Sequence, residues 1–140
     1  MDRITRDRTK GASELAREAL ELMGAAAQES RASTPTALLQ ELEELAQKLS
    51  RSRPSMAPLS NYLGLFFYRL AQEKTKTVDE LKRSARLLAR RLVQESQEAT
   101  LKVAEQALTI LASGDRVITA SYSSTVCLAL EKAAALPQKC

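Results

Sequence analysis

The longest uninterrupted helical pattern in the sequence is TVDELKRSARLLARRLVQESQEATLKVAEQALTILAS, residues 77–113. Thr77 followed by Glu80 has the spacing of a capping box, in which two side chains bond the first free backbone N–H groups of a helix. Gly114 supplies a stop signal after the last helical residue. The apolar residues form a near-heptad seam: Val78, Leu81, Ala85, Leu88, Leu92, Ala99, Val103, Ala107 and Leu111. The stretch therefore predicts one long amphipathic helix.

This seam has two interpretations. It fits a coiled-coil partner, or it fits a spine on which shorter helices of the same chain pack. We favour the spine, because three upstream segments also carry apolar stripes that need a surface on which to be buried. The long helix is then the centre of a helical bundle.

Two of the shorter helices have clear start signals. Residues 12–28 place apolar side chains at helical spacing, and Gly11 can open this helix. In the next helix, Thr34 is a plausible N-cap and Pro35 takes the first helical position, where its missing N–H costs nothing. We expect this second helix to run to about Leu49.

The third helix is expected from Leu59 to about Gln72. It is the most apolar of the set, which favours a central position in the bundle. Residues 50–58, which contain two prolines and several small polar residues, predict an ordered loop before it. This loop carries Arg53 as a candidate functional residue.

The pattern changes after Gly114. Residues 116–120 predict a short strand, residues 121–124 a loop, and residues 125–135 a helix, which together open a doubly wound α/β sheet. One strand cannot form a sheet, so the unit needs strands that the sequence does not contain. We predict a mainly α fold with a helical bundle of about four helices over residues 1–113, and a truncated α/β domain over residues 114–140.

Composition excludes several classes of function. The net charge is +4, but 17 acidic residues are interspersed among 21 basic ones, so we expect no direct nucleic-acid partner. Two cysteines and no histidine give no metal-ligand spacing and no histidine-based triad. We expect neither a metal nor another cofactor.

No apolar stretch approaches the length of a membrane span, roughly 20 residues. The charged residues 1–10 are not followed by the apolar core of a signal peptide. A cytoplasmic protein without membrane contact is therefore expected.

Three motifs occur in a distinctive order along the chain: Lys10-Gly11-Ala12, Arg53-Pro54-Ser55, and the segment GDRVITASYSSTV over residues 114–126. This ordered set resembles the translation initiation factor 2B alpha/beta/delta family. There an Arg-Gly-Ala turn and an Arg-Pro-Thr loop precede the first strand of a Rossmann-like domain, which ends in a Leu-Thr-His-X-X-Ser turn. The resemblance implies that residues 114–140 begin such a Rossmann-like domain.

The superfamily contains regulatory subunits and also isomerases of methylthioribose-1-phosphate or ribose-1,5-bisphosphate. In the isomerases the turn resembles Thr-His-Cys, and the cysteine works with a later aspartate to move protons between C1 and C2 of the sugar. The matching positions are Thr119, Ala120 and Ser121. A serine hydroxyl is far less acidic than a thiol, and the chain has no histidine to activate it. The resemblance therefore predicts a noncatalytic protein.

Regulatory members of the superfamily carry a small residue followed by Tyr-Ser at the same turn. Ser121, Tyr122 and Ser123 match that pattern. They also follow the carboxyl end of the predicted strand, where open sheets bind ligands. Alternatively the turn is repacked in a truncated chain. Cys127, inside the following helix, is interpreted as a core residue.

A phosphate site is one of two interpretations of the start of the first helix. Lys10, Gly11 and Ala12 place backbone N–H groups and the helix dipole where an anion binds, and Arg53 is a candidate donor to the same phosphate. Lys10 keeps the charge of the family's arginine but loses its bidentate fork. The alternatives are a plain helix start with a solvated lysine, and an arginine that anchors its own loop.

The resemblance implies a noncatalytic regulatory or assembly subunit that senses a nucleotide or sugar phosphate between its two domains. Its expected partners are proteins: further copies of itself or related initiation-factor subunits. Two alternatives stay open. One is the N-terminal part of a divergent sugar-phosphate isomerase, and the other is a free-standing helical interaction module whose last residues pack on the bundle.

Overall fold

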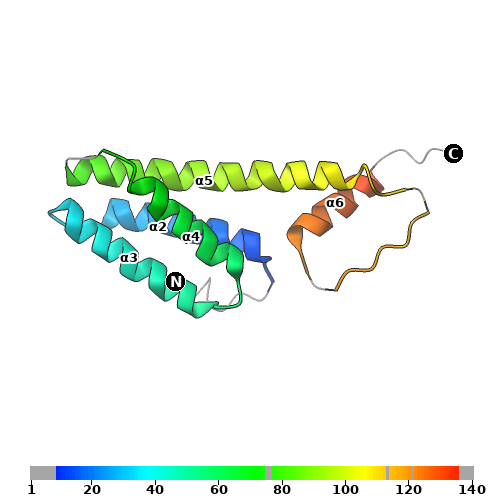
Figure 1. Ribbon diagram of the computed structural model, residues 1–140, viewed down its shortest axis with the longest axis horizontal. Coiled ribbons are helices and arrows are strands. Elements are labelled where there is room, and N and C mark those ends of the chain that lie inside the picture. Colours follow the sequence, from blue (N-terminus) through cyan, green and yellow to red (C-terminus); the bar gives the residue numbers. More distant parts are fainter. Residues whose placement is uncertain (1–8, 75–76, 113, 121, 136–140) are drawn as a thin grey trace. The chain divides into compact units, whose positions relative to one another are not determined.

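The computed structural model describes residues 9–74, 77–112, 114–120 and 122–135 (Figure 1). The described residues form five helices and no strand, so the fold is mainly α. The chain divides into two compact units, Met1–Gln94 and Glu95–Cys140. Each unit is described by itself.

The first unit is a helical bundle. It contains α2 (Ala12–Glu29), α3 (Pro35–Ser52), α4 (Ala57–Leu70) and the beginning of α5 (Val78–Ala107). Successive helices alternate in direction, and α2 packs against both α3 and α4 (Figure 1). This alternation is the up-down-up-down arrangement of helices joined by short connections.

One apolar core joins all four helices of the first unit. Phe66 of α4 is fully buried and makes an edge-to-face contact with Phe67. Burying a side chain of leucine or phenylalanine size contributes about 1.5–3 kcal/mol, so these residues stabilise the bundle. The core also includes Leu15, Leu20, Met23, Leu38, Leu42, Leu49, Leu59, Leu63, Leu81, Leu88 and Leu92. The predicted seam of α5 thus packs on the shorter helices as far as Leu92.

A glycine lets α2 and α5 approach closely. A Cβ atom added at Gly24 would lie 3.0 Å from the Cβ of Ala89 and 3.6 Å from the Cα of Arg86. The first of these contacts is shorter than an ordinary van der Waals contact, so a side chain here would have to displace Ala89. The small residue at this position therefore permits the close packing of the two helices.

Two predicted helix starts are confirmed. The Thr34 hydroxyl accepts a hydrogen bond from the Ala37 N–H at 3.2 Å, with Pro35 at the first helical position. At α5, the Thr77 N–H donates to the Glu80 carboxylate at 3.0 Å and the Glu80 N–H donates to the Thr77 hydroxyl at 3.2 Å. The capping box is complete.

The predicted loop over residues 50–58 is shorter than expected. Helix α3 continues to Ser52, whose hydroxyl donates to the Leu49 carbonyl at 2.7 Å. Helix α4 already begins at Ala57, because Pro58 lies in its first turn, where a missing N–H breaks no helical hydrogen bond. The loop that carries Arg53 therefore spans only residues 53–56.

In the second unit, α5 ends at Ala107 and not at the predicted Ser113. The N–H groups of residues 108, 109 and 110 bond to carbonyls three residues earlier, at 3.0–3.2 Å. The Thr109 hydroxyl also donates to the Gln106 carbonyl at 2.7 Å, which competes with regular helix bonding. Gly114, with φ +89°, closes a later turn in which the Asp115 carboxylate accepts from the Ala112 N–H.

The heptad seam is followed only in part beyond Leu92, where its residues Ala107 and Leu111 are half-buried but two others are exposed. Ala99 and Val103 are exposed, whereas Ser96 and Ala104 are buried and Thr100 is half-buried. A straight helix has 3.6 residues per turn and drifts away from a seven-residue repeat. In the later part of α5, the buried or half-buried residues Leu92, Ser96, Thr100 and Ala104 are therefore spaced four residues apart.

The strand predicted over residues 116–120 is not observed. Its apolar residues Val117 and Ile118 are 48% and 94% exposed. A strand exists only with a hydrogen-bonded neighbour, and the described residues supply none. Of the predicted strand, loop and helix, only the helix is observed: α6 (Ser124–Ala134) starts one residue earlier than predicted.

Candidate functional site

The predicted phosphate-binding motif lies at the start of α2. Gly11 is the buried N-cap residue with extended φ and ψ, and its carbonyl accepts from the N–H groups of Glu14 and Leu15 at 3.1 Å. The first backbone N–H groups of a helix lack partners within the helix, and such groups can hold an anion at a helix N-terminus.

Two carboxylates also bond at this helix start. The Gly11 N–H donates to the Glu14 carboxylate at 2.9 Å, and the Lys10 ammonium forms an ion pair with Glu18. Both side chains of the ion pair are about one quarter exposed. A phosphate arriving here would meet two nearby negative charges, which oppose its binding.

Arg53 directly follows α3. Its backbone N–H donates to the Ser50 carbonyl at 3.4 Å, and its own carbonyl accepts from the Met56 N–H at 3.0 Å. The side chain is half-buried, and its Nε atom is buried. A buried guanidinium atom fits the anchoring interpretation of Arg53, and the same group could also serve as a charged donor.

The start of α2 and the loop between α3 and α4 lie at the same end of the bundle (Figure 1). This follows from the alternating directions of the helices, because α2 and α4 begin at the same end. Lys10, Gly11, Ala12 and Arg53 are therefore four predicted site residues that the first unit brings to one end.

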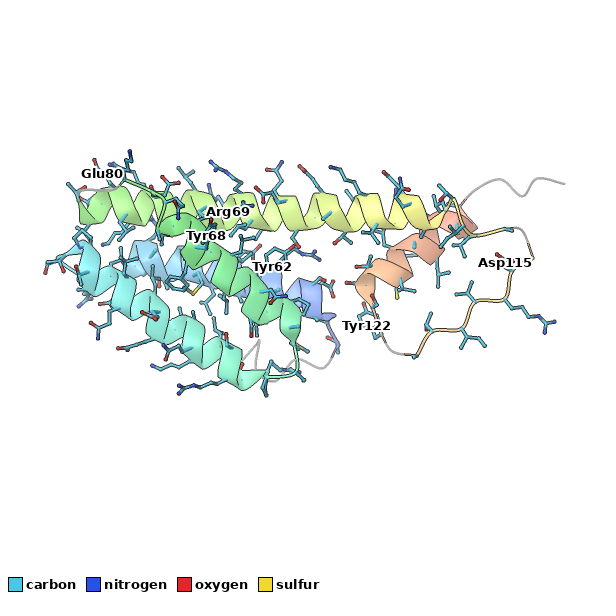
Figure 2. All side chains as sticks on the ribbon, viewed as in Figure 1. Tyr62, Tyr68, Arg69, Glu80, Asp115 and Tyr122 are labelled. Carbon is cyan, nitrogen blue, oxygen red and sulfur yellow. The ribbon has the colours of Figure 1, made fainter. Side chains whose placement is uncertain are left out.

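The other predicted site residues belong to the second unit. Tyr122 is 61% exposed just before α6 (Figure 2). Ser123 is the N-cap of α6, and its hydroxyl accepts from the Val126 N–H at 3.4 Å. Ser121 lies outside the described residues. Cys127 is half-buried inside α6 and forms no disulfide.

The motif analysis missed Glu14 and Glu18. Glu14 stands three residues after Gly11, which is the spacing at which a carboxylate reaches back to an N-cap N–H. That signal was available in the sequence. The contact between Lys10 and Glu18 depends on how the chain enters the helix, which a spacing rule does not give.

No three carboxylate, thiol or imidazole side chains come together in a metal-binding arrangement within the part of the chain that the structure describes. None of the described helices is long and apolar enough to cross a membrane. The chemistry of the site therefore rests on backbone N–H groups, an ammonium group, a guanidinium group and hydroxyl groups.

These features define a class: a helical bundle in the first unit and a small second unit that contains α6. The chain belongs to the initiation factor 2 subunit family, whose sequence model matches residues 8–139. It is also 27% identical over 124 residues to a ribose 1,5-bisphosphate isomerase from Pyrococcus furiosus. That alignment covers 87% of this chain and 38% of the isomerase, so the chain spans well under half the length of this relative.

Proposed function

We propose that the chain is the N-terminal helical part of a noncatalytic regulatory or assembly subunit of initiation-factor-2B type. The observation that carries the proposal is the residue type at positions 119–121, where Thr-Ala-Ser replaces the Thr-His-Cys pattern of the isomerases. Without a thiol at this turn, and without a histidine anywhere in the chain, the proton transfer at the sugar lacks its usual acid and base.

The start of α2 supports the same proposal. Its ammonium group and one of its backbone donors already bond to carboxylates of the same helix, Glu18 and Glu14. Such a site binds phosphate weakly, because the carboxylates compete with the ligand. Weak, reversible binding suits sensing of a nucleotide or sugar phosphate at Lys10, Gly11, Ala12 and Arg53.

The second candidate is the N-terminal part of a divergent sugar-phosphate isomerase. The favouring observation is the 27% identity with the relative from Pyrococcus furiosus, which is a ribose 1,5-bisphosphate isomerase. The two candidate functions share a fold but differ in whether the protein converts a sugar phosphate. A measurement of isomerase activity therefore separates them.

The test uses the protein that carries this chain, incubated with ribose 1,5-bisphosphate while proton NMR follows the C1 and C2 signals. We expect no turnover. We expect the Ser121→Cys variant to gain activity only if the rest of an isomerase site is present, with Ser123→Cys as the matched control. Turnover by the unmodified protein would overturn the noncatalytic proposal.

A further inference from the structure

The exposed side of α5 in the first unit carries a strip of positive charge. Residues 81–94 contain five basic side chains and no acidic one. Lys82 is half-buried, and its ammonium group donates to the Ser30 carbonyl at 2.6 Å, so this residue serves the bundle. The other four are exposed arginines that form no ion pair within the described part of the chain: Arg83, Arg86, Arg90 and Arg91. Their guanidinium groups are available to a partner.

This arginine strip lowers the stability of its own helix. Arg86 stands three residues after Arg83 and four before Arg90, so neighbouring charges lie side by side on the surface of α5. Like charges at these spacings destabilise a helix, whereas opposite charges stabilise it. The exposed side of α3 has the stabilising arrangement, with Glu44 four residues before Lys48. A run of one sign that its own helix does not neutralise fits a surface that meets the opposite charge on a partner.

An exposed leucine lies within the arginine strip. Leu87 is 60% exposed. It stands four residues after Arg83 and three before Arg90, so the three side chains share one face of the helix. Arginine is enriched in protein interfaces, where its planar guanidinium group can bond a carboxylate through two parallel N–H groups. The strip therefore offers a partner an apolar contact between two sites for carboxylates.

Acidic side chains lie on both sides of the arginine strip and limit its width. A pocket between α2 and α5 is lined by two arginines of the strip together with Glu21 and Glu29. A pocket on the other side is lined by Arg91 together with Glu73, which follows α4. A broad polyanion such as a nucleic-acid duplex would bring its phosphates against these carboxylates, and like charges repel. The strip therefore fits a narrow partner that contacts α5 alone.

We propose that the arginine strip of α5 binds an acidic amphipathic helix of a partner protein. Carboxylates of the partner pair with the guanidinium groups of Arg83 and Arg90, and an apolar side chain between them covers Leu87. The two arginines are seven residues and so roughly 10 Å apart along α5, which is two helical turns on the partner as well. The strip does not include the start of α2, and the proposal stands whether or not the protein has isomerase activity.

Fluorescence anisotropy with a labelled synthetic peptide tests the proposal. The peptide repeats the sequence Glu-Glu-Ala-Leu-Glu-Ala-Ala over roughly 20 residues, which is long enough to form a helix. Its control has glutamine in place of every glutamate. We expect the acidic peptide to bind and the glutamine peptide not to bind. The affinity should fall at least about tenfold between roughly 50 and 500 mM salt, because salt screens exposed charges.

Substitutions locate the binding surface. Arg83→Glu combined with Arg90→Glu should weaken binding of the acidic peptide at least about tenfold, since attraction becomes repulsion at two contacts. Leu87→Ala should weaken it about threefold, because a smaller apolar contact is buried. The matched control combines Lys48→Glu with Arg51→Glu, which reverses two exposed charges of α3 and changes the net charge equally. This control should keep the affinity within about twofold, because distant charges are screened. Circular dichroism should show the same helix content in all variants.

Three results would contradict the proposal. The first is no binding of the acidic peptide at low salt. The second is equal weakening by the α3 control and by the reversal of Arg83 and Arg90, which indicates attraction by net charge alone. The third is tighter binding of a single-stranded RNA or DNA oligonucleotide that the same reversal abolishes, which assigns the arginine strip to nucleic acid.

Discussion

Gly24 shows how much the bundle depends on one absent side chain. The added Cβ at this position is already 3.0 Å from Ala89, and the next nearest atom belongs to the backbone of α5. The contact with the Ala89 methyl group is tighter than an ordinary van der Waals contact, whereas the backbone contact is not. A side chain at this position therefore has to displace Ala89 or move α2 and α5 apart.

We expect Gly24→Leu to lower the free energy of unfolding by about 1–3 kcal/mol, because overpacking forces the helices apart. Urea denaturation followed by circular dichroism measures the change. Gly64→Leu is the control, since its side chain enters open space and it gains helix propensity. Equal effects at the two positions would contradict the packing described for Gly24.

Glu18 is the second residue whose removal is informative. It holds the Lys10 ammonium in an ion pair, and a partly exposed ion pair of this kind contributes about 0.2–1 kcal/mol. Glu18→Gln should therefore strengthen binding of inorganic phosphate at the start of α2 by up to about fivefold. Isothermal titration calorimetry measures the affinity.

The matched control for this substitution is Glu21→Gln, an exposed carboxylate one turn along the same helix. It changes net charge equally but should alter phosphate affinity less. A Glu18→Gln variant that binds phosphate no better than the unmodified chain would argue for the plain helix start.

At the scale of the element, α5 depends on the capping box at its start. Thr77→Ala removes the hydroxyl that accepts from the Glu80 N–H, and we expect a loss of about 1 kcal/mol in unfolding free energy. Thermal or urea unfolding measures it. Thr36→Ala, at an exposed position within the first turn of α3, is the control and should have little effect or a slight stabilising one.

The helix starts were predictable from sequence, and the helix ends were not. A cap at Thr34 or Thr77 is decided by atoms three residues apart, so a short sequence pattern contains the whole interaction. The end of α5 at Ala107 is decided by a change to tighter backbone bonding, to which a threonine hydroxyl contributes. The stop signal at Gly114 was assigned to the wrong turn for that reason.

The buried face of α5 shows a second limit of pattern reading. As far as Leu92 the seam was correct, because the shorter helices carry stripes that match it. Beyond that point Ala99 and Val103 fitted the heptad but are exposed. Alanine and valine occur on both faces of helices, so spacing alone could not decide which of them is buried.

For the whole molecule, the helical fold was predictable because it is built from local patterns. The strand predicted over residues 116–120 is not observed among the described residues, because a strand forms only beside a neighbouring strand. The motifs singled out Lys10, Gly11, Ala12 and Arg53, whose role as a site stays a prediction. The sequence also contained the spacing that pairs Glu14 with Gly11, whereas the contact of Glu18 with Lys10 came only from the structure. The family assignment supports the same ordered motifs over residues 8–139.

The exposed connection after Gly114 has a consequence for solubility. Val117 and Ile118 are β-branched, exposed and adjacent, which is the composition of segments that stack into intermolecular sheets. Asp115 and Arg116 stand directly before them and are charged, and such flanking charges oppose aggregation. Asp115 and Arg116 thus act as gatekeepers. We expect them to oppose aggregation through Val117 and Ile118, which have no partner strand among the described residues.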